Sequence, residues 1–406
     1  MFDNVLFQNA TDLLREDVLS DRLPNSLLFS GPPASGKLTA ALELARVLSC
    51  RNTDKGHWMC TCPSCLQHKS LVSRDLLITG PRDCTLEIAA SRKTFIEAVK
   101  NQASHINASR YLFIRSIRKL ISRFNPVLWE DDDKTGKISS IVSSIDELIE
   151  EIDPTRPVSS QVVLEKQCDE LLSLCTKLES SFMYDSIPVS HIRNASFWAR
   201  HTSAEGKKVL VIENAERMQE SVRNALLKIL EEPPSDVIFI LTTSRRGAVM
   251  PTILSRVRTY AFVERLAEQQ ADVITRVYHE QGLSIEKFLF SFLPVQPDEV
   301  KKMAEEFYGN ICSLQMPDIE LLVKNAKNFE PRILLSIFFN EIFTIQRNLI
   351  RESNDSFKPI ILEQTHKRLG FIRNCYESIT IYNQSSISAL EKLASDMLNF
   401  SSNFGS

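Results

Sequence analysis

The sequence predicts an α/β fold, with a parallel five-stranded sheet covered by helices in residues 1–262 and helices alone thereafter. Three observations lead to this prediction. Short apolar runs bounded by turn residues recur up to Phe262 and stop after it. Segments with helical apolar spacing separate these runs, as in alternating α/β proteins. The runs are continuously apolar, which is typical of strands buried on both faces of a sheet.

The five expected strands are short, and most are bounded by glycine or polar residues. They cover Ser26–Gly31, Asp75–Gly80, Lys207–Glu213, Asp236–Thr243 and Arg258–Phe262. Helices are expected over Lys37–Leu48 and Ser221–Leu230. The second helix should end at "EEPP", because proline lacks an amide hydrogen and restricts the residue before it.

The interval from about 91 to 183 breaks this alternation, and we expect a helical insertion there. Its apolar side chains recur at helical spacing opposite an acidic face; they are Ile138, Ile141, Val142, Ile145, Leu148, Ile149 and Ile152. Another expected helix presents the basic side chains Arg110, Arg115, Arg118, Lys119 and Arg123. These could contact phosphate, although a solvated basic face needs no function and is the commoner case.

Amphipathic helices continue to the C-terminus. The best boundary between them lies at "LQMPD" (Leu314–Asp318) and "NFEPR" (Asn328–Arg332). We therefore expect a small helical domain over residues 263–327 and a final helical bundle over residues 328–406.

Composition is that of an ordinary globular protein. Charged residues make up 24% of the chain and the net charge is −3, so contact with DNA would need a local basic patch. The N-terminus lacks a basic start followed by an apolar core, and no apolar run approaches the ~18 residues that span a bilayer. We expect a cytoplasmic protein with no membrane contact.

A phosphate-binding loop follows the first expected strand and opens a helix, the context that such a loop requires. Backbone amides, the helix N-terminus and the Lys37 ammonium group would hold ATP. The expected contacts are Gly31, Pro32, Pro33, Ala34, Ser35, Gly36, Lys37, Leu38 and Thr39. Leu38 stands where a hydroxyl normally ligates magnesium, and Thr39 is rotated ~100° around the helix.

A second nucleotide-binding motif lies in the stretch "VLVIENAE", where Glu213 and Asn214 follow the apolar run. Glu213 could hold a hydrated metal. Asn214 has no carboxylate to polarise water, and such general-base help is worth roughly 10²- to 10⁴-fold. Asn214 could instead only cap the next helix. Together with Leu38, this motif predicts a loop that binds ATP with weak or no hydrolysis.

Four of the nine cysteines, Cys50, Cys60, Cys62 and Cys65, cluster after the first helix. Four thiolates can close a tetrahedral structural Zn²⁺ site. His57 or His68 could replace one of them. A redox pair at Cys62 and Cys65 is an alternative, but the strand and helix of a thioredoxin-like unit are missing. Ordinary buried cysteines are a third possibility.

These motifs, with "KVLVIENAERM", "NALLKILEEPP", "ILTTS" and "PTILSRV", resemble the bacterial clamp-loader subunits of DNA polymerase III, members of the AAA+ superfamily. The resemblance covers residues 1 to about 90 and 187 to about 262. It implies an AAA+ P-loop domain, a helical lid at 263–327 and a helical collar at 328–406 for oligomerisation. The family does not lead us to expect the insertion, and its cysteines are usually spaced Cys-x₂-Cys-x₂-Cys.

The resemblance also implies a role and partners. Clamp-loader subunits form a heteropentamer of gamma/tau, delta and delta-prime subunits, which loads the sliding clamp onto primer-template DNA. The "IENAE" stretch is similar to delta-prime subunits, whereas a gamma/tau-type ATP-hydrolysing motor subunit is the alternative. A helicase loader or another AAA+ regulator is a third reading. Arg256 in "SRV" occupies the family position of an arginine finger, which acts in trans on a neighbour's ATP and is worth on the order of 10³-fold or more.

Overall fold

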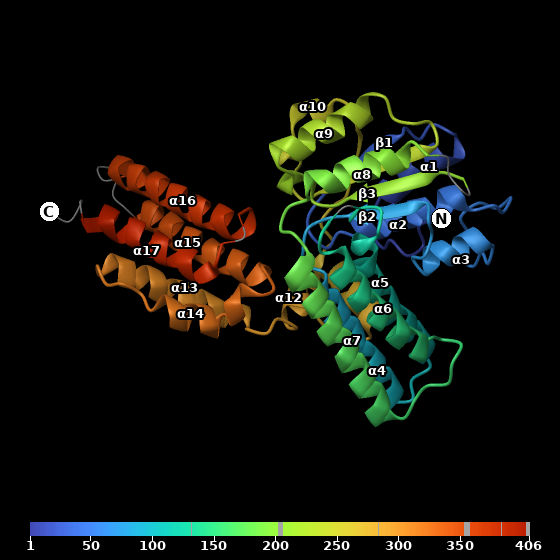
Figure 1. Ribbon diagram of the computed structural model, residues 1–406, viewed down its shortest axis with the longest axis horizontal. Helices are drawn as coiled ribbons and strands as arrows, with labels where there is room; N and C mark the ends of the chain where they lie inside the picture. The colour runs from blue at the N-terminus through green and yellow to red at the C-terminus, as the bar shows by residue number, and fades with distance from the viewer. Residues whose placement is uncertain (131, 202–205, 283, 353–357, 383, 403–406) are drawn as a thin grey trace. The chain divides into compact units, whose positions relative to one another are not determined.

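The computed structural model describes the chain except residues 131, 202–205, 283, 353–357, 383 and 403–406 (Figure 1). It forms two compact units, Met1–Leu289 and Phe290–Ser406. The division between the units falls inside the range 263–327 that the sequence suggests for a lid. The expected three-domain organisation stays a prediction.

The first unit contains the predicted parallel sheet. Its strands are β1 (Ser26–Ser30), β2 (Leu76–Thr79), β3 (Lys208–Ile212), β4 (Val237–Thr243) and β5 (Arg258–Ala261). They pair in the order β2-β3-β4-β1-β5, and every pair is parallel. The predicted fold class and the five strands are confirmed, with bounds that differ by no more than a residue at either end.

Helices connect the strands and cover the sheet (Figure 1). Those before β3 are α1 (Ala10–Leu19), α2 (Lys37–Ser49), α3 (Pro63–Lys69), α4 (Thr85–Lys100), α5 (Ile106–Ile121), η1 (Ser122–Phe124), α6 (Thr135–Glu151), α7 (Gln161–Phe182) and α8 (Val189–Ala199). Those after β3 are η2 (Ala215–Arg217), α9 (Glu220–Glu231), η3 (Arg246–Ala248), α10 (Pro251–Leu254), α11 (Ala267–Tyr278) and α12 (Ile285–Phe290).

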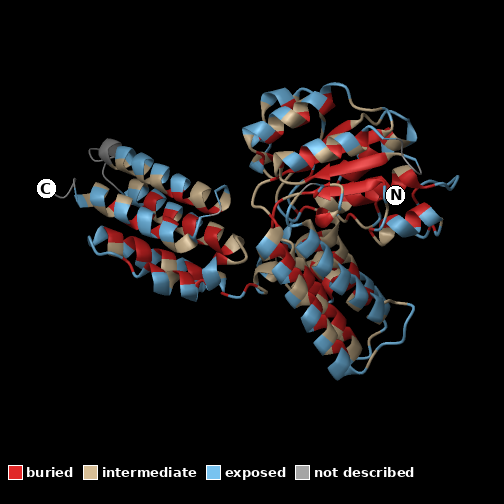
Figure 2. Ribbon diagram, viewed as in Figure 1, coloured by how far each residue is buried: buried red, intermediate tan, exposed pale blue. Residues whose placement is uncertain are grey.

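The sheet lies between two hydrophobic cores. In β1, Leu27 and Phe29 join the core that includes α1 and α2, while Leu28 points to the opposite core. The same alternation holds in β3 and β4, because successive side chains of a strand point to opposite faces. The edge strand β5 is partly exposed, whereas β1, β3 and β4 are covered on both faces and are almost entirely buried (Figure 2). This burial is the physical reason for their continuous apolarity.

Helices α4 to α7 occupy the interval in which the sequence suggests an insertion. Their core is continuous with that of the sheet: Phe113 and Ile117 of α5 and Leu171 of α7 belong to the same buried cluster as Leu77 and Leu210 of the strands. The interval is therefore built onto one face of the sheet and does not form a hydrophobic core of its own.

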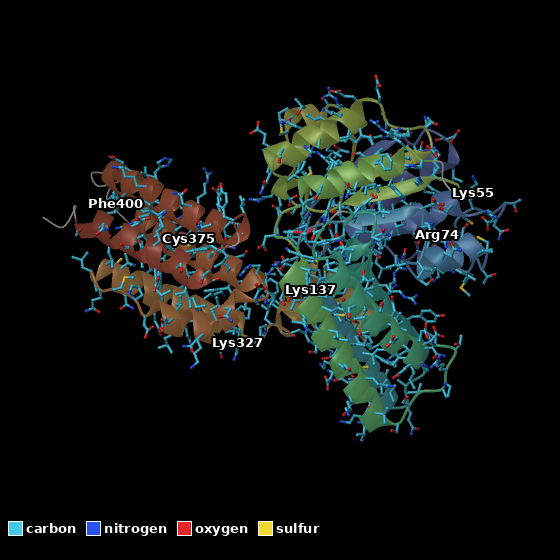
Figure 3. The ribbon with its side chains drawn as sticks, in the orientation of Figure 1. Lys55, Arg74, Lys137, Lys327, Cys375 and Phe400 are labelled. Carbon is cyan, nitrogen blue, oxygen red and sulfur yellow. The ribbon has the colours of Figure 1, made fainter. Side chains whose placement is uncertain are left out.

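The second unit is all helical among its described residues. Its elements are α13 (Pro297–Cys312), α14 (Ile319–Asn325), η4 (Lys327–Phe329), α15 (Ile333–Glu352), α16 (Lys358–Thr380) and α17 (Ser386–Ser402). Phe338 of α15 lies at its centre, with its ring edge-on to those of Phe307 and Phe329. Cys375 of α16 and Phe400 of α17 mark two further helices of the bundle (Figure 3).

One described helix, α15, is long and apolar enough to cross a membrane by length and composition alone. Its side chains Leu334, Leu335, Phe338 and Ile342 are fully buried within the second unit. A core helix of a bundle passes the same test, and this burial accounts for the apolarity of one side of α15, whereas Phe343 and Leu349 are exposed.

Candidate functional site

The candidate site lies at one edge of the sheet. Parallel strands end at the same edge, and backbone hydrogen bonds continue the ladder beyond them. The Gly31 amide donates to the Thr243 carbonyl (3.1 Å), and the Glu213 amide donates to the Thr79 carbonyl (2.9 Å). The phosphate loop after β1 and the acidic motif after β3 are thereby fixed on either side of the end of β4.

The phosphate loop has the backbone geometry that its glycines predict. Gly36 has φ +93°, which side chains disfavour. A Cβ on Gly31 would lie 2.2 Å from the Phe262 carbonyl oxygen, so only glycine fits between the loop and the end of β5. Ala34 also adopts a positive φ of 55°. The loop then leads directly into α2, whose first residue is Lys37.

The Lys37 side chain folds back onto its own loop. Its Nζ donates to the carbonyl oxygens of Gly31 (2.6 Å) and Pro32 (2.5 Å). Burial is the largest influence on this group and lowers the pKa of Lys37 to about 8, against the opposing carboxylates of Glu216 and Glu213. The ammonium group therefore stays charged at neutral pH, and it would exchange these carbonyls for phosphate oxygens.

Arg265 braces the outer side of the loop. Its guanidinium donates to the carbonyl oxygens of Ala34 (2.6 Å) and Leu6 (2.9 Å). A cavity of about 130 Å³ lies beside it, lined by residues 32–35 of the loop, Gln270 and Ile285. Typical small-molecule pockets are about 300–1,000 Å³, so a whole nucleotide would have to extend beyond this cavity. Sequence reasoning missed Arg265, which lies outside every recognised motif.

The acidic motif contains an ion pair that the sequence did not indicate. Glu213 accepts a hydrogen bond at Oε2 from the guanidinium of Arg123, which lies in η1. The Arg123 side chain is only 6% exposed and that of Glu213 16% exposed, so this pair is largely shielded from water. Burial alone would lower the pKa of Arg123, but negative neighbours including Glu213 raise it above its usual range.

Asn214 and Glu216 complete the motif. Asn214 adopts a left-handed conformation with φ 52°, which asparagine tolerates better than most residues. Its amide donates to the Thr242 hydroxyl (3.3 Å). Glu216 accepts from the Ser244 amide (3.0 Å) and hydroxyl (2.5 Å), which links β3 to the end of β4. Burial raises the pKa of Glu216, but these hydrogen bonds outweigh it and the net shift is downward.

The residues at this edge do not fit a magnesium ion, which P-loop enzymes hold with a hydroxyl and a carboxylate. Leu38 offers no oxygen and packs against the core formed with α1 and α2. The Oε2 atom of Glu213 is already bonded to Arg123. The loop geometry suits a phosphate group, whereas the metal ligands of this fold are missing or already paired.

A separate candidate metal centre lies at the other end of α2. The sulfur atoms of Cys50, Cys60, Cys62 and Cys65 all lie within 4.8 Å of one another. The separation of 3.8 Å between Cys50 Sγ and Cys60 Sγ suits two sulfurs that each lie ~2.3 Å from one metal ion. Among the described residues this group contains neither His57 nor His68. His68 is instead buried, which lowers its pKa to about 4.

Arg46 ties the cysteine cluster to α2. This buried guanidinium pairs with Glu43 (2.5 Å) and donates to the Gly56 carbonyl (2.6 Å) and to Cys65 Sγ (3.2 Å). It also lies 5.4 Å from the centre of the Trp58 ring. Gly56, Trp58 and Cys65 therefore contact an internal cation on α2. Lys55, next to Gly56, is exposed (Figure 3).

Replacing Arg46 with methionine is expected to destabilise the chain strongly. The Glu43 carboxylate would remain buried without its partner, and breaking a buried pair from one side typically costs about 3–5 kcal/mol. Urea unfolding followed by fluorescence measures this loss. The double variant Arg46→Met/Glu43→Gln should lose less, because no charge is left buried. Equal losses in the two variants would show that the charge pair is not the cause.

The five basic residues of the helical interval have internal partners. Arg115 and Arg118 donate to the carbonyls of His68 (3.2 Å) and Ser70 (2.9 Å) at the C-terminal end of α3. Lys119 pairs with Glu87, and Arg110 donates to the Ile152 carbonyl (2.5 Å). With Arg123 at Glu213, these residues act as internal connectors. They form neither a phosphate-binding face nor a freely solvated one.

Arg256 lies on the surface just after α10. It donates to Glu231 of α9 (2.7 Å) and to the Thr252 carbonyl (2.7 Å). Its side chain is 33% exposed and that of Glu231 52% exposed. Exposed ion pairs are worth only ~0–1 kcal/mol, so Arg256 can exchange Glu231 for another anion at little cost.

Comparisons with known proteins identify the family of this chain. The family described as "DNA polymerase III, delta subunit" matches residues 7–125 and 145–265. Within the helical interval, the match therefore omits residues 126–144. A "DNA polymerase III subunit gamma/tau" of Mycobacterium bovis is 30% identical over 24% of this chain and 17% of its own length. A "DNA polymerase III subunit delta'" of Pseudomonas aeruginosa is 33% identical over 25% of this chain and 33% of its own length.

These relatives are matched over a small part of their length, so the chain spans a third or less of each. Among solved structures, a DNA polymerase III gamma subunit-related protein of Thermotoga maritima covers 57% of this chain and 90% of its own, with 15% identity and a TM-score of 0.25.

Proposed function

This chain belongs to the family described as DNA polymerase III, delta subunit, and on that premise we propose that it is a delta-prime-like subunit of the clamp loader. It would join gamma/tau and delta subunits in a heteropentamer in the cytoplasm. The complex would use ATP to load the sliding clamp onto primer-template DNA, which this chain would meet through the complex.

One asymmetry in the molecule supports the delta-prime-like role. At the chain's own phosphate loop, Leu38 supplies no hydroxyl, and Asn214 supplies no carboxylate to activate water. Arg256, in contrast, lies exposed on the surface with only weak internal bonds. A subunit with this distribution would hydrolyse little or no ATP itself and would complete the active site of a neighbour.

The expected action of Arg256 follows from its chemistry. A guanidinium is always charged and presents several donors in a fixed plane, so it can bind two phosphate oxygens at once. In a neighbour's site it would stabilise the charge that develops during phosphoryl transfer. The short helix α10 and the Thr252 carbonyl would hold its backbone and side chain in place.

The cysteine cluster is proposed to hold one structural Zn²⁺ through Cys50, Cys60, Cys62 and Cys65. Four thiolates suit zinc, and structural sites leave no open coordination position. The loop Gly31–Lys37 is proposed to hold ATP weakly, if the Lys37 ammonium turns from its loop carbonyls to the phosphates.

A gamma/tau-type motor subunit is the second candidate. The intact loop residues Gly31, Gly36 and Lys37 favour it, as does the similarity to gamma/tau subunits. A motor subunit would bind ATP tightly with Mg²⁺ and hydrolyse it in isolation.

Reconstitution tests the proposed function. Complexes of purified gamma/tau and delta subunits from the same source are assayed for clamp loading on primed DNA, with and without this chain. We expect loading only when the chain is present, and we expect no ATP turnover by the chain alone. Full loading without it would contradict the proposal, while turnover by the isolated chain would favour the motor subunit.

A further inference from the structure

The acidic motif receives its counter-charge from the helical interval. Arg123 lies in η1, directly after α5, and is ninety residues away from Glu213 in the sequence. Its Nη2 donates to Glu213 Oε2. Thus one oxygen of the carboxylate is already bonded to a buried guanidinium.

Arg123 is held firmly in this position. Its carbonyl accepts a hydrogen bond from the Trp129 indole (2.9 Å), and its Nη1 donates to the Lys119 carbonyl. The ring of Trp129 stacks between those of Phe124 (centroids 5.4 Å apart) and Tyr184 (5.6 Å). This packing fixes the backbone of η1, so Arg123 is a built part of the site and not a mobile surface side chain.

Glu213 is equally constrained. Its amide is bonded to the Thr79 carbonyl at the end of β2. Gly80 lies directly against it, since a Cβ there would come within 2.9 Å of Glu213 Cβ and 3.0 Å of Oε2. Gly80 and Arg123 therefore both lie against Glu213 on the side of β2, where the absence of a side chain at Gly80 leaves room for the ion pair.

We propose that the guanidinium of Arg123 takes the place of a divalent cation at the acidic motif, so that any polyphosphate in the loop binds without metal. Magnesium needs near-octahedral oxygen ligands. Here Leu38 gives none, and Glu213 shares its charge with a fixed cation. This inference concerns the chain's own site and can fail while the subunit assignment holds, because a delta-prime-like subunit could also hold Mg²⁺ with ATP.

The test measures chemical unfolding of the full chain with a non-hydrolysable ATP analogue, in buffer with Mg²⁺ or in the same buffer without Mg²⁺ and without a chelator, so that the cysteine cluster is not disturbed. We expect the wild type to be equally stable in both. Arg123→Met should raise the equilibrium constant for unfolding of the first unit roughly ten- to hundredfold, because Glu213 keeps a largely buried charge. Millimolar Mg²⁺ should restore part of this loss, since the freed carboxylate gains a new cation.

Two variants keep the test decisive if Arg123→Met does not fold. Arg123→Met/Glu213→Gln removes both charges and should stay within about tenfold of the wild type. Arg118→Met, on the preceding helix, is the control for loss of an arginine that donates to a backbone carbonyl, and Mg²⁺ should not affect it. The proposal is overturned if Mg²⁺ stabilises the wild type tenfold or more over Mg²⁺-free buffer, or if Mg²⁺ fails to restore any stability to a folded Arg123→Met.

Discussion

Replacing Arg256 with alanine is expected to remove nearly all of the ATP turnover at the one site that Arg256 completes, and so to lower the total turnover of the reconstituted clamp loader by about that site's share. An arginine that stabilises phosphoryl-transfer charge is worth on the order of 10³-fold or more at the site that it completes. The other sites of the ring would dilute this loss in the total rate. Turnover stimulated by clamp and primed DNA is the quantity to measure.

The Arg256→Ala chain itself should fold normally, because the side chain is exposed and its pair with Glu231 contributes little stability. Arg193→Ala is a matched control, since it removes another exposed arginine, on α8. Glu231→Gln should leave turnover nearly unchanged, because it only frees Arg256. If Arg256→Ala and Arg193→Ala gave the same turnover, Arg256 would be an ordinary surface residue.

Loss of the cysteine cluster is expected to have the largest effect on stability. In the purified chain we expect one zinc ion, and Cys65→Ser should lose it. The variant should be destabilised by about 3 kcal/mol or more, a modest part of the about 10–16 kcal/mol that zinc contributes in isolated zinc-finger peptides. Elemental analysis and thermal unfolding measure the two effects together.

Cys312→Ser is the matched control, because Cys312 is an exposed thiol outside the cluster. It should change neither the metal content nor the unfolding midpoint. A chelator should reproduce the effect of Cys65→Ser in the wild type. If the wild-type chain contains no metal and unfolds at the same midpoint as Cys65→Ser, the four residues are ordinary buried cysteines.

The sheet could be predicted from sequence because its strands obey a local rule. The inner strands are buried on both faces, so they appear as continuous apolar runs such as "KVLVI" or "VIFILTT". The phosphate loop could be predicted for a similar reason, since Gly31, Gly36 and Lys37 lie within seven consecutive residues. The grouping of the four cysteines also follows from their nearness in the sequence.

The contacts that close the site could not be predicted, because they join distant segments. Arg123 reaches Glu213 across ninety residues, and Arg265 reaches Ala34 across 231. As part of a basic helix, Arg123 looked like a solvated or phosphate-binding residue. Only the packing of η1 beside the ends of β2 and β3 reveals its carboxylate partner. The use of Arg46 as a buried cation within the cysteine cluster was hidden for the same reason.

This chain is proposed to serve the clamp loader without hydrolysing ATP at its own loop. The most direct test is Lys37→Ala, introduced into this subunit alone and assayed for ATP turnover in the reconstituted complex with clamp and primed DNA. We predict turnover within about twofold of the wild type, since hydrolysis would occur at other subunits. A collapse of turnover would show that this loop is a working ATPase site and would contradict the account.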